Sequence, residues 1–288
     1  MIRDKGKALI KKRLKPSFYV GKIVSYLILT LLGVIIIFPF LFALSTSFTS
    51  ADNIYDFQWI PQPIDIGNYV QFFSENNVFQ ALGLTFAYVI PVVFVGTFMS
   101  MLAAYAFARI NFKGSKIAYY GILATVVVPS IITLVPSYIL FTNVYHWTGT
   151  PLPIIIPGMF GGALTMFFLA QYFKTLPKEL EEAAQIDGMS RVGIFLKIII
   201  PLSIPAIITQ IILSFNGCYN DYLGPLLYLG GNEELYTIQL LVASIQTASS
   251  KPYTLMMAAA ITALIPTFIL YIFCQKYFVE GIAMTGLK

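Results

Sequence analysis

Acidic side chains are concentrated in one short stretch of this chain, residues 176–188. The stretch reads Leu-Pro-Lys-Glu-Leu-Glu-Glu-Ala-Ala-Gln-Ile-Asp-Gly. No histidine or cysteine lies close enough in the sequence to complete a metal site with these carboxylates. The sequence also lacks a glycine-rich phosphate-binding loop that ends in Gly-Lys-Ser or Gly-Lys-Thr. These acidic residues are therefore expected to pair with charges on another protein, rather than to catalyse the making or breaking of bonds.

The other candidates for chemistry are isolated from one another. His146 is the only histidine and falls in an expected loop, where a surface or interface role is the ordinary interpretation. Cys218 and Cys274 fit no metal or redox spacing and are interpreted as small buried residues. Four serines near the expected membrane segments have no acid–base partners in view: Ser45, Ser47, Ser130 and Ser137. We therefore expect a protein that is not an enzyme and has no cofactor or metal of its own.

A short helix, a glycine turn and a second helix are predicted to position the acidic stretch. Pro177 suits the first turn of a helix, and the glutamates that follow it face the positive helix start. Gly188 stands where a residue of positive φ would end this helix, and Ser190 can cap the next one. The second helix then continues into an apolar segment that is bent by Pro201 and Pro205.

The first of these helices is predicted to present a small, flat apolar face, because Leu180, Ala183 and Ala184 recur at helical spacing. A helix that lies on lipid is the alternative, but such helices combine bulky apolar residues with lysine or arginine. Acidic residues would also be repelled by an anionic inner leaflet. The composition therefore favours docking into another protein.

The rest of the chain has the composition of a membrane protein. Of its 288 residues, 58% are hydrophobic and 11% are charged, and the mean hydropathy is +0.78. A soluble domain carries about a quarter charged residues. A membrane-spanning helix needs about 20 apolar residues, and six segments qualify: residues 23–45, 82–108, 117–141, 152–173, 194–217 and 255–275. They predict an all-α protein with a basic N-terminus at residues 1–22, one transmembrane domain at residues 23–288 and the acidic helix in a loop at residues 174–193.

Lysine and arginine set the expected orientation. Eight of them lie within the first 22 residues, and others follow the second, fourth and sixth segments, whereas the opposite loops hold only Lys251. By the positive-inside rule, both termini and the 174–193 loop are cytoplasmic. The net charge of +5 thus flanks a membrane and gives no reason to expect nucleic acid. The apolar run after the basic N-terminus is too long for a signal peptide and predicts a retained first span.

The position of the acidic residues also bears on energy coupling. Every one of them falls in an expected loop or at its edge, and Asp221 comes nearest to the membrane. Ion-coupled carriers place ionisable residues inside their spans. We therefore expect the energy for any transport to come from another protein, through the acidic helix.

Several of these residues resemble the EAA loop of bacterial ABC importer permeases. The resemblance rests on Glu182-Ala183-Ala184, Asp187-Gly188, Ile198 and Pro201-Leu202 with Pro205. Two further matches are Asn220 with Pro225-Leu226 after the fifth segment, and the glycine-containing tail of residues 281–288. The closest likeness is to carbohydrate-uptake permeases of the maltose type, specifically the smaller subunit. Where the family has tryptophan before the asparagine, this chain has Tyr219.

The resemblance implies a six-helix type I (MetI-like) permease fold with a cytoplasmic coupling helix. It implies a heterodimer with a homologous permease, two cytoplasmic ATPase subunits that bind ATP and Mg, and an external solute-binding protein. Glu182 corresponds to the glutamate that pairs with a basic group of the ATPase, and the tail corresponds to a segment that reaches the ATPase interface. The expected docking residues are Glu179, Leu180, Glu182, Ala183, Ala184, Asp187 and Gly188.

A polar stripe follows the fifth segment and is a candidate substrate pathway. It consists of Gln210, Ser214, Asn216, Tyr219 and Asn220. Weaker candidates lie on the third and fourth segments: Thr125, Ser130, Thr133 and Thr165. Sugar sites combine such polar groups with aromatic faces. Ordinary hydrogen bonding between helices explains the stripe equally well, so both interpretations stay open at this point.

The sequence and its resemblance thus predict a permease subunit of an ATP-driven importer for a sugar or oligosaccharide, in the bacterial cytoplasmic membrane. A permease for another substrate, such as glycerol phosphate, is the near alternative, and the scarcity of cationic residues in the spans favours a neutral substrate. A stand-alone carrier would need an ionisable pair inside the membrane. A membrane scaffold without transport activity is the third alternative.

Overall fold

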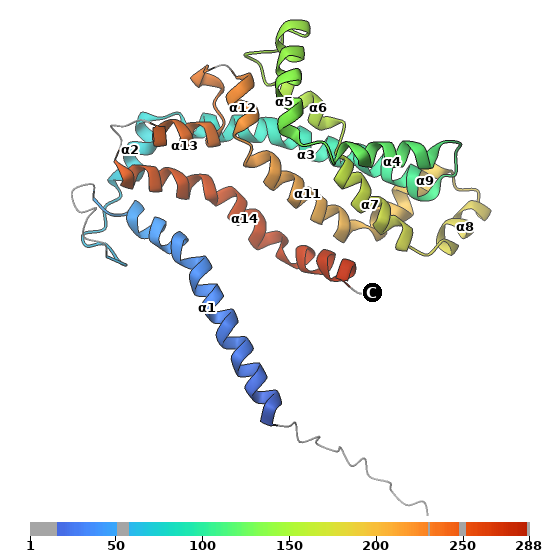
Figure 1. The fold of residues 1–288 in the computed structure, drawn as a ribbon, viewed down its shortest axis with the longest axis horizontal. Coiled ribbons are helices and arrows are strands. Elements are labelled where there is room, and N and C mark those ends of the chain that lie inside the picture. The colour runs from blue at the N-terminus through green and yellow to red at the C-terminus, as the bar shows by residue number, and fades with distance from the viewer. Residues whose placement is uncertain (1–15, 51–57, 230, 248–251, 287–288) are drawn as a thin grey trace, which may run out of the picture.

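The computed structural model describes the backbone of residues 16–50, 58–229, 231–247 and 252–286, and every regular element within these ranges is a helix (Figure 1). In chain order these are α1 (Pro16–Ser47), α2 (Gly67–Glu75), α3 (Val78–Arg109), α4 (Ser115–Thr125), α5 (Ser130–Ile139), the π-helix η2 (Leu140–Val144), α6 (Leu152–Met159), α7 (Ala163–Thr175), α8 (Glu179–Ile186), α9 (Arg191–Ile194), the π-helix η3 (Phe195–Ile199), α10 (Ile200–Leu202), α11 (Ile204–Tyr219), α12 (Leu223–Tyr228), the 3₁₀-helix η4 (Glu233–Leu235), α13 (Ile238–Thr247) and α14 (Tyr253–Gly286).

Each of the six expected spans coincides with a long apolar helix or a bent pair of helices. Four helical stretches are long and apolar enough to cross a membrane by themselves: residues 21–47, 78–109, 152–175 and 253–277. The pair formed by α4 with α5 and η2 bends by 91°, and the pair formed by α9–α10 with α11 bends by 79°. The all-helical architecture is therefore confirmed, and six complete crossings remain the prediction.

Prolines explain the two bends. Pro129 precedes α5 with an extended backbone, and it has no N–H with which to continue a helix from α4. Pro201 and Pro205 flank Ser203, where α10 ends and α11 begins. The sequence predicted the second bend from the same two prolines.

The bundle is organised around α3. This helix packs against α6, α7 and α11 along its length, and α14 packs against α11 and α13. The α2 and α8 helices lie at opposite ends of the bundle (Figure 1), which are called here the α2 end and the α8 end. One apolar core fills the α2 end around Phe72, Val93, Tyr219, Ile238 and Leu255. A second fills the α8 end around Tyr105, Leu169, Phe173, Ile194 and Phe195.

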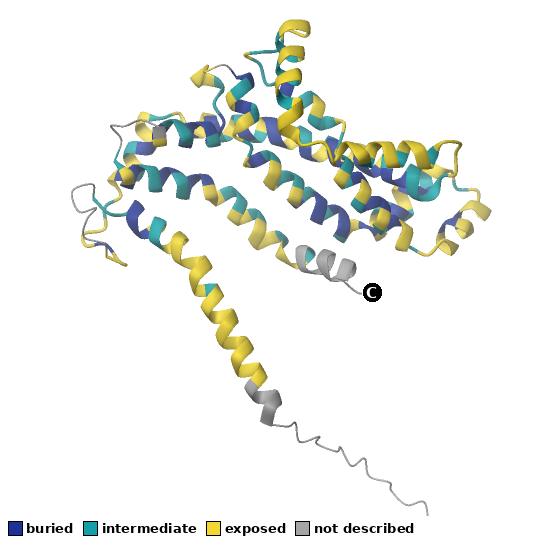
Figure 2. Cartoon of the chain, in the orientation of Figure 1, coloured by how far each residue is buried: buried dark blue, intermediate teal, exposed yellow. Residues whose placement is uncertain are grey.

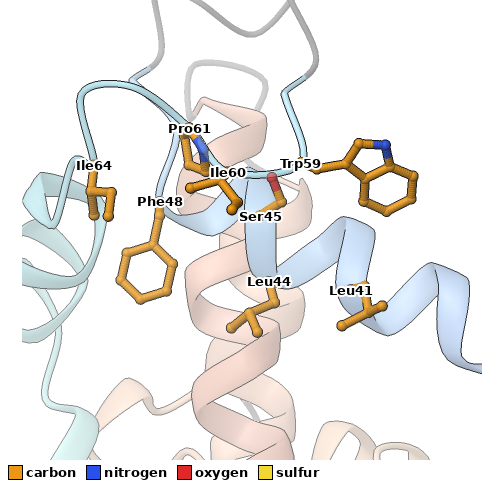
Figure 3. A pocket seen from close by; sticks show the side chains of 8 residues that line it. All are labelled: Leu41, Leu44, Ser45, Phe48, Trp59, Ile60, Pro61 and Ile64. Carbon is orange, nitrogen blue, oxygen red and sulfur yellow. The ribbon is translucent and has the colours of Figure 1, made fainter.

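The first helix differs from the rest because it projects away from the bundle (Figures 1 and 2). Its described side chains are exposed over most of its length, and burial begins only near Ser45. The last turns form an apolar pocket with the segment that follows (Figure 3), lined by Leu41, Leu44, Ser45, Phe48, Trp59, Ile60, Pro61 and Ile64. An apolar helix of this length requires lipid or another protein around it.

Asn68 connects the C-terminal end of α1 to the bundle. Its amide donates to the carbonyl oxygens of Ser47 at 3.0 Å and Thr49 at 2.9 Å. Its carbonyl oxygen accepts a 2.9 Å hydrogen bond from the Thr254 hydroxyl at the start of α14. Asn68 is 6% exposed. The nitrogen and the oxygen of its side-chain amide therefore both have hydrogen-bond partners inside the protein.

We expect Asn68→Ala to lower the stability of the purified protein by roughly 2–4 kcal/mol, because it leaves several buried polar groups without partners. The measurement is unfolding in detergent by heat or denaturant. Asn77→Ala is the control, since Asn77 is exposed and its side chain caps no helix. Equal stability of the two variants would show that the Asn68 contacts contribute nothing measurable.

Gly161 and Gly162 allow a close approach to α3 at the point where α6 meets α7. Gly161 has φ +88°, and a Cβ atom there would lie 2.8 Å from the Gly96 carbonyl oxygen and would overlap the Ser100 hydroxyl. Ser100 in turn accepts a 3.1 Å hydrogen bond from the Gly162 amide. Glycine at this position therefore lets the broken fourth segment lie directly on the α3 backbone.

Candidate coupling helix and substrate-pathway surface

The acidic stretch forms α8, a short helix at the end of the bundle opposite α2 (Figure 1). Lys178 is the residue that caps its start, and the Lys178 carbonyl accepts from the amides of Glu181 at 2.9 Å and Glu182 at 3.0 Å. Pro177 therefore precedes the helix, and the expectation that it occupies the first turn was wrong. The physical reason is that the first helical amides donate to the Lys178 carbonyl, whereas the Leu176 carbonyl accepts from Arg109 instead and starts no helix. Leu176 itself is extended, with ψ 142°, as the residue before a proline usually is. The proline thus ends α7 instead of starting α8.

The end of α8 has the geometry that the sequence predicted. Gly188 adopts φ +79°, and the Met189 amide donates to the Ala184 carbonyl at 2.9 Å. The Ser190 hydroxyl then accepts a 3.2 Å hydrogen bond from the Gly193 amide and caps α9. This turn sets the angle between α8 and α9.

We expect Gly188→Val to destabilise the turn by about 1–2 kcal/mol, because L-residues disfavour a left-handed backbone. A Cβ atom at Gly188 meets nothing within 4 Å, so the effect isolates the backbone angle from steric overlap. Gly121→Val is the matched control, since Gly121 has equal space around it but lies inside α4 without a positive φ. The measurement is thermal unfolding together with protease cleavage near residue 188. Equal behaviour of the two variants would contradict the role assigned to the turn.

The two sides of α8 have different environments. Glu179, Glu182, Ala183 and Asp187 are exposed, and Leu180 is 44% exposed. Ala184 is 6% exposed and packs into the core at the α8 end, so this one member of the expected docking set faces the bundle instead of a partner. Ile186, which the sequence did not single out, is 86% exposed. A partner that contacts α8 would therefore meet acidic side chains around three apolar ones, Leu180, Ala183 and Ile186.

Glu181 also faces the bundle, and it is paired with the last residue of α3. Its carboxylate oxygen lies 2.8 Å from Nε of Arg109, and the two side chains are 10% and 4% exposed. The Arg109 Nε–H does not point directly at this oxygen, so the contact is a close charge pair rather than a well-aligned hydrogen bond. Arg109 also donates from Nη2 to the Leu176 carbonyl at 2.6 Å. The sequence had placed Arg109 only among the positive residues that flank a membrane.

The polar stripe of the fifth segment divides into buried and accessible residues. Gln210 is 5% exposed, and Tyr219 is 1% exposed with its hydroxyl donating to the Ala263 carbonyl at 2.7 Å. These two lie inside the packing between helices. Asn216 and Asn220 are exposed, and the Asn220 amide donates at 2.9 Å to both the carbonyl and the side-chain oxygen of Asn216.

Ser214 lies on a cavity of about 280 Å³ between α3, the α6–α7 break and α11. Its lining consists of small and hydroxyl-bearing residues, with Cys218 and Val92 beside them: Gly96, Thr97, Ser100, Gly158, Gly161, Gly162, Thr165 and Gly217. Thr165 is the weaker sequence candidate that the fold brings to this surface. Thr125 and Thr133 instead donate to carbonyls of their own helices, at 2.6 and 2.9 Å. The cavity is thus open to hydroxyl chemistry and contains no ionisable carboxylate or amine among its lining residues.

Metal chemistry has no candidate among the described residues, which contain no group of three or more histidine, cysteine or carboxylate side chains. Cys218 and Cys274 are both free thiols. His146 is exposed and has φ 54°. The tail at residues 281–288 reaches Gly286 as part of α14, but its side chains lie outside the described residues.

Comparison with solved structures finds the same fold in a bacterial ABC transporter involved in the import of the acidic polysaccharide alginate. The match has a TM-score of 0.78 and 22% sequence identity, and it covers 91% of this chain and 98% of that one. A second alginate transporter structure, in complex with a periplasmic protein that carries an alginate pentasaccharide, matches with a TM-score of 0.67 and 17% identity over 91% and 96% of the two chains.

Sequence comparison finds relatives in several oligosaccharide importers. The maltodextrin transport system permease protein MdxG of Bacillus subtilis is 30% identical over 279 residues, covering 93% of this chain and 96% of the relative. The arabinooligosaccharides transport system permease protein AraQ of Halalkalibacterium halodurans is 30% identical over 232 residues, covering 79% and 81%. The trehalose/maltose transport system permease protein MalG of Thermococcus litoralis is 30% identical over 262 residues, covering 90% and 94%.

A family model agrees with these relatives over most of the bundle. The model, described as the inner membrane component of binding-protein-dependent transport systems, matches residues 96–283, which include α8, its glycine turn and the cavity on α11. Together with the shared fold and the curated relatives, this match fixes the family. The chain belongs to the binding-protein-dependent transport system inner membrane components, which are permease subunits of ABC importers and not enzymes.

Proposed function

We propose that this chain is one of two permease subunits of an importer for a neutral sugar or oligosaccharide. In this proposal α8 receives the force of separate ATPase subunits, and ATP and Mg bind to those subunits rather than to this chain. The observation that carries the proposal is the exposed acidic side of α8, with Glu179, Glu182 and Asp187 around Leu180 and Ala183. Such a surface fits a basic cleft on a protein better than it fits lipid.

The distribution of charge supports an orientation in which the α8 end is cytoplasmic. Basic residues at or near this end include Arg109, Lys113, Lys116, Lys174, Lys178 and Arg191, whereas Asp65, Glu75, Glu233 and Glu234 belong to segments near the α2 end. The positive-inside rule then gives a multi-pass protein of the bacterial cytoplasmic membrane with both termini inside. The first 15 residues and the last two lie outside the described part of the chain.

The substrate pathway in this proposal runs along the cavity that Ser214 shares with Thr97, Ser100 and Thr165. Hydroxyl groups and glycine backbone can exchange hydrogen bonds with sugar hydroxyls, and no lysine or arginine lines the cavity to hold a phosphate. Asn216 and Asn220 extend the polar surface toward the α2 end. Gln210 and Tyr219 contribute to it only if α11 changes its packing during the cycle.

A second, homologous permease would complete this pathway from the other side, in a pseudo-twofold heterodimer. The exposed α1 supports the proposal, because an apolar helix whose side chains are exposed over most of its length needs lipid or a neighbouring subunit beside it. An external solute-binding protein would deliver the sugar at the α2 end. The relatives that carry arabinooligosaccharides, maltodextrin, and trehalose or maltose support the substrate class.

The mechanism proposed is alternating access. Closure of the ATPase subunits on ATP moves α8, which short turns join to α7 on one side and to α9 on the other. The two bent segments supply packed helices that can shift as bodies, so the cavity opens outward when the ATPases close. Hydrolysis returns the cavity to its inward-facing state.

Purification of the tagged chain from cells that express its neighbouring transport genes tests this function. We expect the ATPase and a second permease to co-purify, and the reconstituted complex to import sugar only with ATP and the loaded binding protein. A chain that purifies alone and carries sugar into liposomes without ATP would instead be a stand-alone carrier. Absence of both partners and transport would favour a scaffold.

A further inference from the structure

We propose that Arg109 and Glu181 are positioning residues that couple α8 to α3, so that a movement of α8 also moves the central helix of the bundle. The inference rests on the proposed function, in which α8 is the helix that receives the ATPase. It concerns a different side of that helix. The docking surface faces outward, whereas Glu181 faces the bundle and is 7% exposed.

Chain connectivity alone does not join α8 to α3. Short turns join α8 to α7 and α9, while α3 ends at Arg109 and the chain then turns into α4. The connection to α3 is made by side chains. Arg109 contacts Glu181 at 2.8 Å and also donates to the Leu176 carbonyl at 2.6 Å. It therefore binds both α8 and the segment that precedes this helix.

A second residue of α3, Tyr105, contacts the segment that follows α8. The Tyr105 hydroxyl lies 3.4 Å from the Arg191 carbonyl, and the Tyr105 ring lies 5.1 Å from the Phe195 ring. Tyr105 and Arg109 are four residues apart and therefore share one face of α3. The last turn of α3 thus holds the segments before and after the docking helix.

The other end of α3 contacts the segments near the α2 end. The Gln80 amide donates to the Glu234 carbonyl in η4 at 2.9 Å, and the Thr85 hydroxyl accepts from the Ile238 amide of α13 at 2.9 Å. The 32 residues of α3 extend about 48 Å as a helix. One helix therefore links the coupling helix to the end of the bundle where the sugar would enter.

A buried arginine–carboxylate pair suits this link because two opposite charges in close contact away from water are hard to separate. The planar guanidinium can contact Glu181 and the Leu176 carbonyl together, which the single ammonium of lysine cannot do with the same geometry. Separation of the pair would leave two charges in a largely dry site. The pair is therefore expected to hold while α8 moves, and α3 is expected to follow.

The test is an exchange of charges in the complete importer complex. Arg109→Glu and Glu181→Arg are made singly and together, and Arg109→Lys is the conservative variant. Lys197→Glu is the control, since Lys197 is an exposed basic residue on η3. The measurements are ATPase co-purification, ATP hydrolysis, and sugar imported per ATP hydrolysed by each assembled complex over a range of sugar concentrations.

We expect each single reversal to lower the sugar imported per ATP by about 10-fold or more. The exchange should recover part of this loss, because it restores the charge pair but a carboxylate at position 109 cannot donate to the Leu176 carbonyl. The sugar imported per ATP by Arg109→Lys should lie between the values for the single reversals and the wild type. The half-saturating sugar concentration should not change, because the pair does not contact substrate. Single variants that couple normally, or an exchange no better than either single variant, would overturn the inference. If the single reversals fail to assemble, the exchange and Arg109→Lys variants decide the outcome. Failure of the wild-type chain to bind an ATPase would instead count against the proposed function.

Discussion

Glu182→Lys is expected to weaken the association of the ATPase with this chain by at least about 10-fold, which corresponds to about 1.4 kcal/mol of binding free energy. Glu182 lies in the first turn of α8, and its side chain is exposed. The substitution should therefore leave the packing of the chain itself intact. By resemblance it faces a basic group of the ATPase, so the lysine replaces an attraction with a repulsion. Its position also distinguishes it from Glu181, which is one residue away but is buried against Arg109.

The cost of this substitution to α8 itself is small. A lysine near the positive start of an exposed helix destabilises it by about 0.3–1 kcal/mol, so the chain should still insert and purify. The measurement is the amount of ATPase that co-purifies, followed by ATP hydrolysis stimulated by the loaded binding protein. Glu233→Lys is the control, because Glu233 is an exposed glutamate at the start of η4, near the α2 end. Unchanged stimulated hydrolysis in Glu182→Lys would remove α8 as the docking site.

Gly161→Val should destabilise the protein by about 4 kcal/mol or more, which is the range reached only by severe core defects. The side chain would have to adopt φ +88° and place its Cβ atom 2.8 Å from the Gly96 carbonyl oxygen. It would also displace Ser100, which accepts from the Gly162 amide at the break between α6 and α7. The fourth segment could then no longer lie on α3, and the cavity that both helices line would change shape.

The adjacent glycine provides a close control. Gly162 has φ −124°, and a Cβ atom there would meet only the Thr165 hydroxyl at 3.6 Å, which is an ordinary contact. We expect Gly162→Val to cost about 1 kcal/mol or less, since its backbone is already in the region that valine prefers. Denaturant unfolding of the two purified variants gives the comparison. Two variants of equal stability would show that the bundle can relax around a side chain at Gly161.

The sequence by itself determined the membrane character, the approximate limits of six apolar segments and the local turn at the end of α8. These properties depend on composition and on neighbours along the chain. Gly188 has the positive φ that its position in the stretch predicted, and Ser190 caps the next helix. The family resemblance likewise depends on residues that are close together in sequence, and the family model confirms it over residues 96–283.

Only the tertiary structure decided which side of each helix meets which neighbour. Adjacent helical positions point about 100° apart, so Glu181 and Glu182 look equivalent in the sequence although one is paired with Arg109 and the other is exposed. In the same way, Tyr219 and Gln210 belong to one polar stripe with Ser214, but their burial depends on α14 and other helices that are distant in sequence. Pairing across 72 residues, as between Arg109 and Glu181, leaves no periodic signal in a single chain, because the packing of whole helices brings the two side chains together.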